Sequence, residues 1–386
     1  MWQQDNSIFE GLFVLEMANN HWGDLGRGKE IVDQFAELVR FHGVKAAMKL
    51  QFRDVARFIH KSFRGNEEIR YIKKTEATRM SKEEFSELVE HIRSSGCLPM
   101  ATPFDEASVD LCQEFEFPII KVASSDHNDW PLLEKIATTR KPVIVSSGGA
   151  NQKGLDDVVA FFDNRQIPLA INHCVSLYPS EDTDLELSQI SYLKDRYPNH
   201  VIGYSSHEQY DWSASMLLSY GLGARTWERH VDIQRDGVPV SAYCTLPEQA
   251  HEWFSAYNKS LEMFGNSQSQ RRVVTKPETE YLDALVRGVY AARDLPAGYK
   301  FTKDSFLEDV YLAVPLQKGQ LSTREILNGV SVVGPIAQDA AVSVNDIDEK
   351  FFRSPSLKKM IEERGVDRAG VPRAKNETTK KDSVSP

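Results

Sequence analysis

Short apolar runs alternate with amphipathic runs eight times between residues 11 and 264. The apolar runs have the length of buried parallel strands, and the amphipathic runs have the period of helices. Eight such units in this length are typical of a (β/α)8 TIM barrel. An open doubly wound sheet is the alternative, but it usually carries a glycine-rich phosphate loop after its first strand, and Gly23, Gly26 and Gly28 lack that spacing. The sequence therefore predicts an α/β fold of the barrel type.

The predicted strands are all short, and they span residues 11–15, 44–50, 98–102, 119–122, 143–146, 169–173, 201–204 and 224–227. The predicted helices follow them at residues 29–41, 82–95, 106–115, 130–138, 155–162, 187–196, 212–220 and 247–263. Ser81 and Glu84 have the spacing of a capping box. The polar segment between Leu50 and Met80 is too long for a simple connector, so we expect it to be functional or to form a lid.

After the eighth unit, the alternation of strands and helices gives way to short predicted strands and turns. We expect residues 1–264 to form the barrel, 265–282 a linker, and 283–347 a small β-rich domain. Residues 348–386 are rich in Lys, Arg, Glu and Ser, which predicts a short helix followed by a disordered tail.

Composition limits the possible partners. The net charge of −10 does not favour nucleic acid or an anionic membrane. No apolar run has the length of a membrane span, and no signal peptide is apparent at the N-terminus. The four cysteines show no CxxC pair and no zinc-ligand spacing, as is typical of reduced thiols. We therefore expect a cytoplasmic enzyme.

Polar residues gather where the predicted strands end, which is where a barrel builds its active site. The candidate site residues are Glu16, Lys49, Gln51, Thr102, Lys121, Ser124, Asp126, Ser147, Gly148, Tyr178, Ser205, His207, Glu228 and His230. Lys49 and Lys121 lie within apolar runs and need a partner or an anionic ligand. With the nearby hydroxyls and the backbone amides of 147–149, they could cradle a phosphate and a carboxylate. The alternative for each lysine is an internal ion pair with Glu16, Asp126 or Glu228.

His207 and His230 end two strands that a single crossover helix should make neighbours. Two neutral imidazoles there suit a divalent metal such as Mn²⁺, Zn²⁺ or Fe²⁺, although each could instead only cap its strand. Glu228 lies two residues before His230, so its carboxylate could orient a ligating imidazole. Glu16 could be a general base, a proton carrier or a lysine partner.

Eight motifs, in order, resemble those of the sialic acid synthase family. They are Glu16 to Asp24 (EMANNHWGD), Lys49-Leu50-Gln51, Ala101 to Phe104, Lys121 to Asp126, Ser146 to Gly148, His173-Cys174 with Tyr178-Pro179, Gly203 to His207, and Glu228-Arg229-His230. The resemblance covers residues 11 to about 347, because the small domain resembles the family's C-terminal antifreeze-like (SAF) domain.

The resemblance implies that phosphoenolpyruvate condenses with a sugar aldehyde to give a 2-keto-3-deoxy sugar acid and phosphate, for a surface polysaccharide. It implies that His207 and His230 hold Mn²⁺, or Mg²⁺ or Co²⁺, that Glu16 handles protons, and that Asp126 contacts sugar hydroxyls. It also implies a domain-swapped homodimer. The residues implied to bind phosphoenolpyruvate are Lys49, Gln51, Thr102, Lys121, Ser124, Ser147 and Ser205.

The chain departs from the family pattern at three positions. Ser176 replaces a usual Asn, Val240 a usual Asp, and Val314 a usual Arg, for which Arg324 is the nearest substitute. These departures suggest a different aldehyde from N-acetylmannosamine. Two other functions stay open on the residues themselves: a metal-dependent aldolase or epimerase that does not use phosphoenolpyruvate, and a non-catalytic sugar-binding descendant.

Overall fold

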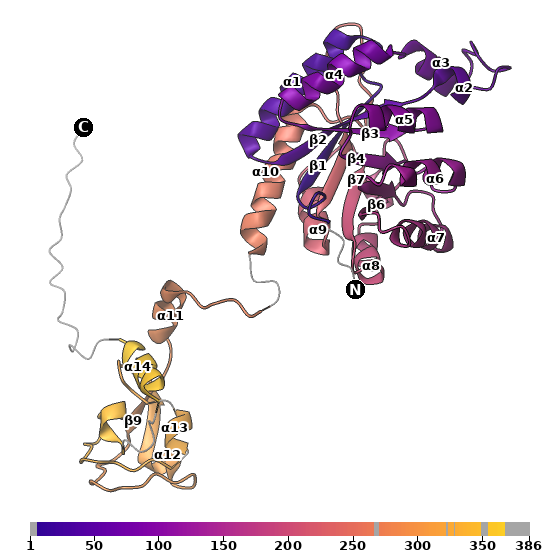
Figure 1. Cartoon of the computed structure of the whole chain (residues 1–386). Coiled ribbons are helices and arrows are strands. Elements are labelled where there is room, and N and C mark those ends of the chain that lie inside the picture. Colours follow the sequence, from indigo (N-terminus) through magenta and orange to yellow (C-terminus); the bar gives the residue numbers. More distant parts are fainter. Residues whose placement is uncertain (1–5, 266–269, 322, 328, 349–353, 367–386) are drawn as a thin grey trace, which may run out of the picture. The chain divides into compact units, whose positions relative to one another are not determined.

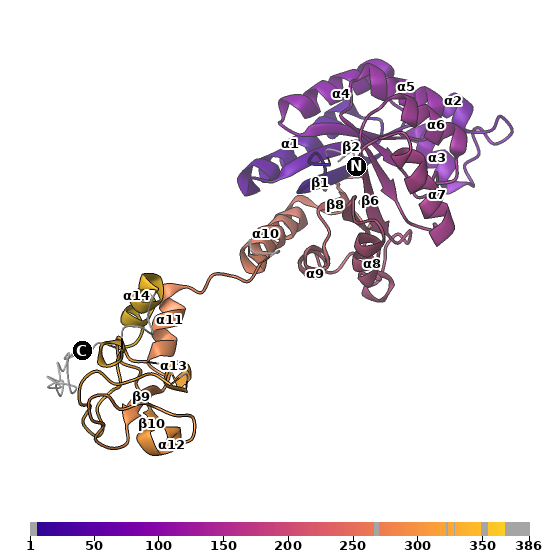
Figure 2. The ribbon, with the colours of Figure 1, turned by 60° about the horizontal axis from the view of Figure 1, so that its bottom comes forward.

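The computed structural model describes residues 6–265, 270–321, 323–327, 329–348 and 354–366. The chain divides into two compact units on either side of the boundary between residues 266 and 267 (Figures 1 and 2).

The first unit is a closed barrel of eight parallel strands that pair in chain order, with β8 returning to β1. The barrel prediction is confirmed, and Figure 1 shows helices outside the strands. The strands are β1 (Leu12–Ala18), β2 (Lys45–Phe52), β3 (Leu98–Pro103), β4 (Ile119–Val122), β5 (Val143–Ser146), β6 (Leu169–Cys174), β7 (Val201–Ser206) and β8 (Thr226–His230).

The helices of this unit are α1 (Leu25–His42), α2 (Val55–Phe58), α3 (Arg70–Ala77), α4 (Lys82–Ser94), α5 (Glu106–Glu114), α6 (Trp130–Thr138), α7 (Gln152–Asp163), α8 (Ser188–Arg196), α9 (Ala214–Leu222) and α10 (Pro247–Phe264), with a 3-10 turn η1 (Asp182–Asp184). The Ser81 and Glu84 capping box of α4 is confirmed. Helix α1 begins four residues earlier than predicted, because the Asp24 side chain caps it by accepting from the Arg27 amide. Among the described residues, no helix combines the length and apolar composition needed to cross a bilayer.

Strand alternation separates two cores. On β1, Leu12 and Val14 belong to a small apolar cluster inside the barrel, which Phe9 also joins. The residues between and after them, Phe13 and Leu15, belong to the larger cluster that includes the surrounding helices. Glu16 is the next residue on the inward side of β1. The interior is therefore apolar at the amino ends of the strands and polar at their carboxyl ends.

Strand β8 runs three residues past its predicted end at Trp227, so Glu228, Arg229 and His230 belong to the strand. The prediction ended there because charged residues are unusual in a buried strand. Here the charges of Glu228 and Arg229 are each matched by buried partners of opposite sign.

The second unit contains a two-stranded antiparallel sheet of β9 (Gly288–Ala291) and β10 (Val310–Ala313) around its own apolar core. Its helices are α11 (Lys276–Asp283), α12 (Phe306–Asp309), α13 (Thr323–Leu327) and α14 (Pro355–Glu363), with a 3-10 turn η2 (Val344–Asp346). Helix α11 lies in the segment predicted as a linker, and its Asp283 accepts from Arg364 at 2.6 Å. The predicted disordered tail lies beyond residue 366, outside the described residues.

Candidate active site

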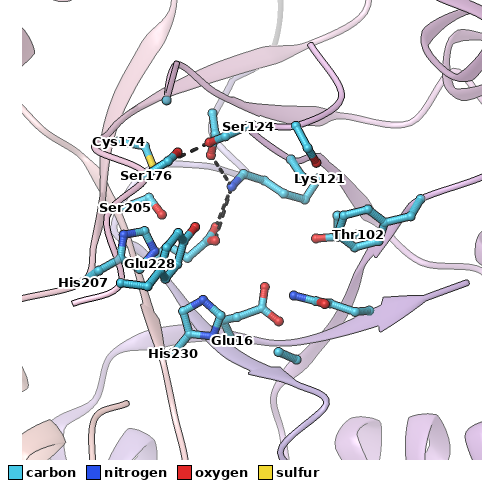
Figure 3. A pocket seen from close by; sticks show the side chains of 18 of the residues that line it. Glu16, Thr102, Lys121, Ser124, Cys174, Ser176, Ser205, His207, Glu228 and His230 are labelled. Carbon is cyan, nitrogen blue, oxygen red and sulfur yellow. Dashed lines mark hydrogen bonds and ion pairs between the residues drawn. The ribbon is translucent and has the colours of Figure 1, made fainter. Parts of the chain in front are cut away.

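A cavity of about 700 Å³ opens at the carboxyl ends of the barrel strands (Figure 3). It brings together twelve of the fourteen residues that the sequence singled out. They are Glu16, Lys49, Gln51, Thr102, Lys121, Ser124, Gly148, Tyr178, Ser205, His207, Glu228 and His230.

Strand register explains why residues so far apart in sequence meet here. Glu16 on β1 lies opposite Lys49 on β2 and opposite His230 on β8. Gln51 lies opposite Thr102, and Ser205 lies opposite Glu228. Because parallel strands end at one rim of a barrel, their terminal polar residues form a single ring.

Two lysines and two glutamates form a buried charge cluster at the floor of the cavity. Lys49 Nζ contacts Glu16 Oε2, lies 3.0 Å from Glu228 Oε1 and donates to Thr102 Oγ1 at 3.0 Å. Lys121 Nζ donates to Glu228 Oε2 at 3.1 Å and to Ser146 Oγ at 2.7 Å. The ion pairs that the sequence left as an alternative are therefore present, and both lysines also line the cavity.

The environment separates the protonation behaviour of the two carboxyl groups. Burial raises the pKa of Glu16, and the attraction of Lys49 only partly offsets this effect. Burial also opposes ionisation of Glu228, but Lys121 and Lys49 together lower its pKa to about 2. Glu16 Oε1 is buried without a hydrogen-bond partner. Glu228 is thus a fixed counter-ion, whereas Glu16 is suited to gain and lose a proton.

His207 and His230 lie next to each other in the cavity lining, with ring centroids 5.6 Å apart. The Tyr178 ring lies 4.0 Å from His207 and 6.0 Å from His230. Burial lowers the pKa of His207 to about 4 and holds the pKa of His230 well below its usual range. Both imidazoles are therefore neutral at pH 7, the state in which they bind metals.

Hydrogen bonding leaves one nitrogen of His207 directed at the cavity. His207 Nδ1 lies 3.1 Å from the Val175 carbonyl oxygen, so Nδ1 carries the proton and Nε2 is left as a lone-pair donor. The Glu228 oxygens bond to Lys121 and Lys49, so the partners that the structure shows for this carboxylate are the two lysines.

The residues present fit a divalent metal held by two imidazoles. The described part of the chain contains no group of three or more His, Cys, Asp or Glu side chains arranged around one metal position. A metal bound by His207 and His230 would therefore need water or substrate oxygens as further ligands, as an open Lewis-acid site requires.

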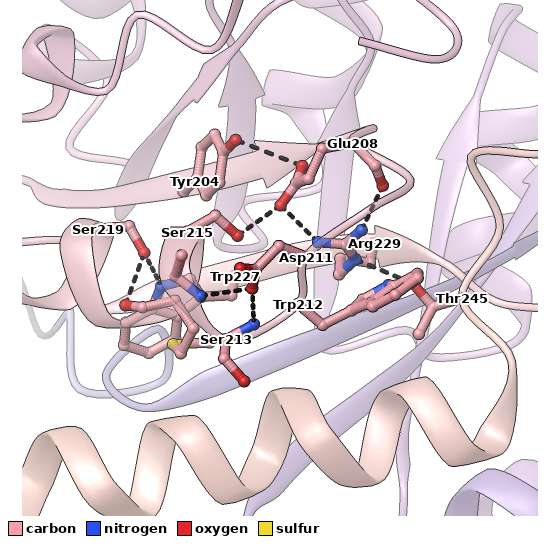
Figure 4. Close-up of polar contacts among 12 residues, drawn as sticks. Tyr204, Glu208, Asp211, Trp212, Ser213, Ser215, Ser219, Trp227, Arg229 and Thr245 are labelled. Carbon is pink, nitrogen blue, oxygen red and sulfur yellow. Dashed lines mark hydrogen bonds and ion pairs between the residues drawn. The ribbon is translucent and has the colours of Figure 1, made fainter. Parts of the chain in front are cut away.

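A buried ion pair of Glu208 and Arg229, each adjacent in sequence to one of the histidines, was not predicted from the sequence (Figure 4). Arg229 Nη1 lies 2.6 Å from Glu208 Oε1, and both side chains are 1% exposed. Arg229 Nη2 also donates to the Glu208 carbonyl at 2.6 Å. Since Glu208 follows His207 and Arg229 precedes His230, this pair ties together the two strand ends that carry the imidazoles. The only signal in the sequence was the position of each charge next to a histidine.

Ser147 and Asp126 are the two candidates that do not line the cavity. The Ser147 amide donates to the Asn172 carbonyl at 3.0 Å, and its Oγ accepts from the Cys174 amide at 3.3 Å, so Ser147 supports the turn before Gly148. Asp126 Oδ1 accepts from Ser125 at 2.7 Å, and its Oδ2 is buried without a partner.

Gly148 can gain a side chain only if two neighbouring hydroxyls move. A β-carbon there would lie 2.3 Å from Ser176 Oγ and 2.6 Å from Ser124 Oγ. The turn therefore presents backbone, flanked by two hydroxyls, to the cavity.

Several cavity residues were not among the candidates. Arg53, Arg70, Tyr71 and Lys74 come from the long polar segment after β2, and Tyr243 comes from the loop after β8. The unusual length of the polar segment predicted a functional element, but loop residues carry no periodic pattern from which their direction could be derived.

Comparison with known proteins places this geometry in a family. A putative spore coat polysaccharide biosynthesis protein E from Chromobacterium violaceum is 37% identical, with a TM-score of 0.84 over 88% of this chain and all of that one. An N-acetylneuraminic acid (sialic acid) synthetase from Leptospira borgpetersenii is 27% identical, with a TM-score of 0.62 over 71% of this chain and 91% of that one. The N-acetylneuraminate-9-phosphate synthase of Drosophila melanogaster is 26% identical over 86% of this chain and 95% of its own length. The model of the NeuB family matches residues 34–268. On this sequence and structural similarity, the chain belongs to the NeuB family, whose members resemble sialic acid synthases.

Proposed function

We propose that this protein condenses phosphoenolpyruvate with a sugar aldehyde, giving a 2-keto-3-deoxy sugar acid of the nonulosonic type and phosphate. The observation that carries the proposal is the pairing, in one cavity, of two buried lysines with two neutral imidazoles. Lysines bind a highly anionic substrate, and neutral imidazoles bind a metal ion that acts as a Lewis acid. Family membership supports the same reaction.

Phosphoenolpyruvate would lie over the floor of the cavity. Lys49 and Lys121 would supply charge, and Gln51, Thr102, Ser124 and Ser205 would supply hydrogen bonds. The Gly148 turn would bring backbone amides close to the phosphate, since no side chain intervenes.

Bond making and breaking follow from this placement. The C2–C3 π electrons of phosphoenolpyruvate form a C–C bond to the aldehyde carbon, and the aldehyde oxygen takes a proton. Water adds at C2 and loses one proton. The C2–O bond to phosphate then breaks with its electron pair leaving on phosphate, while the new C2 hydroxyl loses its proton and becomes the ketone. Glu16, with its raised pKa and unpartnered Oε1, would transfer protons at these oxygens.

His207 and His230 would hold the divalent ion, Mn²⁺ first among the candidates, which when bound polarises the aldehyde. Tyr178, whose ring lies beside both imidazoles, would pack against the acceptor. We also propose a homodimer, for which light scattering should give twice 43.7 kDa.

The test is phosphate release from phosphoenolpyruvate with Mn²⁺ across a panel of aldoses, with and without chelator. Release with one aldose, abolished by chelator and by Glu16→Gln, is the expected result. Glu37→Gln, an exposed carboxylate on α1, is the matched control and should keep wild-type activity. Metal-dependent aldose turnover without consumption of phosphoenolpyruvate would instead identify an aldolase or epimerase.

A further inference from the structure

Three cationic side chains from the segment between β2 and α4 form part of the cavity wall. Arg53 follows the end of β2, and Arg70 and Lys74 lie one turn apart on α3. We call Arg53, Arg70 and Lys74 the rim cluster.

Among the residues that the structure describes, no carboxylate forms an ion pair with the rim cluster. The two acids that line the cavity, Glu16 and Glu228, are paired with Lys49 and Lys121. Within the described parts of the chain, no rim-cluster side chain lies within 4.0 Å of a carboxylate oxygen. The cavity lining therefore has three more cations than anions, although the whole chain has a net charge of −10.

Aromatic rings and one hydroxyl surround the cluster instead. The Arg53 guanidinium carbon lies 3.6 Å from the Phe104 ring centroid, and the guanidinium also donates to the Tyr71 hydroxyl. Its Nε is buried without a partner. Lys74 Nζ lies 5.6 Å from the Trp22 ring. These contacts orient Arg53 and Lys74 and leave donors available on both side chains.

Lys74 is close enough to Arg70 and Arg53 to be repelled by both. Burial lowers the pKa of Lys74, and Arg70 and Arg53 lower it further, although Cys244 and Asp232 oppose this. Glu16 and Asp126 act on Arg53 from a distance, without forming an ion pair with it. Clustered, partly buried positive charges are costly unless an anion joins them.

Phosphoenolpyruvate placed against Lys49 and Lys121 leaves these three cations without an anion. Arg53 follows the last residue of β2, on the carboxyl side of Lys49, so its backbone lies farther out along the barrel wall than the backbone of that lysine. We propose that the rim cluster binds a second anionic group, a phosphate or a carboxylate, on the end of the acceptor sugar farthest from its aldehyde. This inference rests on the proposed function and names the acceptor as an anionic aldose.

The experiment compares acceptors that differ only in the distal anion. The probes are N-acetylmannosamine and its 6-phosphate, D-arabinose and its 5-phosphate, and N-acetylmannosaminuronic acid. We expect kcat/KM for an anionic acceptor to exceed that of its uncharged partner at least 100-fold. The phosphates and the uronic acid distinguish the two possible anions.

Substitutions in the rim cluster test whether it causes the preference for an anionic acceptor. Arg70→Gln and Lys74→Gln should each reduce, about tenfold, the ratio of kcat/KM for the anionic acceptor to kcat/KM for its uncharged partner. Each substitution should also raise the KM of the anionic acceptor more than the KM of phosphoenolpyruvate. Lys73→Gln is the matched control, because Lys73 lies on the same helix, pairs with Glu67 at 3.3 Å and does not line the cavity. It should keep the wild-type ratio.

Different results would overturn the inference and the proposed function. Equal or better use of an uncharged aldose, or an equal rise in the KM of phosphoenolpyruvate, would overturn the subsite and keep the reaction. Absence of turnover with every acceptor would overturn the reaction instead. Titration with inorganic phosphate then decides the subsite: binding weakened by Arg70→Gln but not by Lys73→Gln supports it, and no binding overturns it.

Discussion

The Glu208–Arg229 pair offers the sharpest test of how the site is held in place. Arg229→Met keeps the aliphatic stem but removes the guanidinium, which bonds to Glu208 and, through Nε, to Thr245 Oγ1 at 2.9 Å. The Glu208 carboxylate would then be buried with only the hydroxyls of Ser215 and Tyr204 as side-chain donors. Breaking one partner of a buried ion pair costs about 3–5 kcal/mol of unfolding free energy.

A second substitution distinguishes the loss of the Glu208–Arg229 ion pair from nonspecific destabilisation. Glu208→Gln removes the buried charge and keeps an oxygen that can accept from Ser215. The double variant Glu208→Gln with Arg229→Met should therefore recover about half of the loss, about 1.5–2.5 kcal/mol, and should be more stable than the sum of the two single variants predicts. Urea unfolding followed by tryptophan fluorescence is suitable, because all six tryptophans of the chain lie before residue 254.

The effect of pH gives an independent check with a defined sign. Burial opposes ionisation of Glu208, but Arg229 and Ser215 hold its pKa below the ordinary value of 4.5. The pair thus stabilises the fold above pH 4.5, and its contribution is lost as pH falls through the lower folded pKa. Without Arg229, burial alone raises the pKa of Glu208, so the deficit of Arg229→Met should shrink between pH 8 and pH 5. A deficit that stays constant with pH, or a double variant as unstable as the sum of the singles, would refute the reasoning.

Three further predictions concern ligands. Gly148→Ala places a carbon 2.3 Å from Ser176 Oγ, so calorimetry should show phosphoenolpyruvate binding at least tenfold more weakly; unchanged affinity would contradict the Gly148 cradle. Mn²⁺ affinity of chelator-treated protein should be nearly constant from pH 6 to 8 and should fall only below about pH 5, because the pKa of His207 is about 4 and that of His230 is also far below its usual range. Binding of phosphoenolpyruvate should take up protons, because a trianion beside Glu16 raises further a pKa that burial has already raised. Calorimetry in buffers of different ionisation enthalpy measures this proton uptake. Zero uptake would show that Glu16 does not accept the proton.

Much of the barrel could be predicted because its signals are local. The buried strands Ile119–Val122 and Val143–Ser146 end where their apolar runs end, and α6 (Trp130–Thr138) matches its predicted range. Prediction was less accurate where a polar residue had a tertiary partner. Strand β8 continues through Glu228 because lysines on β2 and β4 neutralise it, and those lysines are more than 100 residues away.

The sequence by itself determined the order of strands and helices, because side-chain periodicity reflects which face of each element is buried. It also determined that polar residues end the strands, and therefore which residues could share a site. Only the tertiary structure decided how those residues are paired. Barrel closure sets Glu16 between Lys49 and His230, sets Glu228 between two lysines, and directs Arg53 and its neighbours into the same cavity. Pairing and protonation depend on distances across the barrel and on burial, and neither is a property of the local sequence.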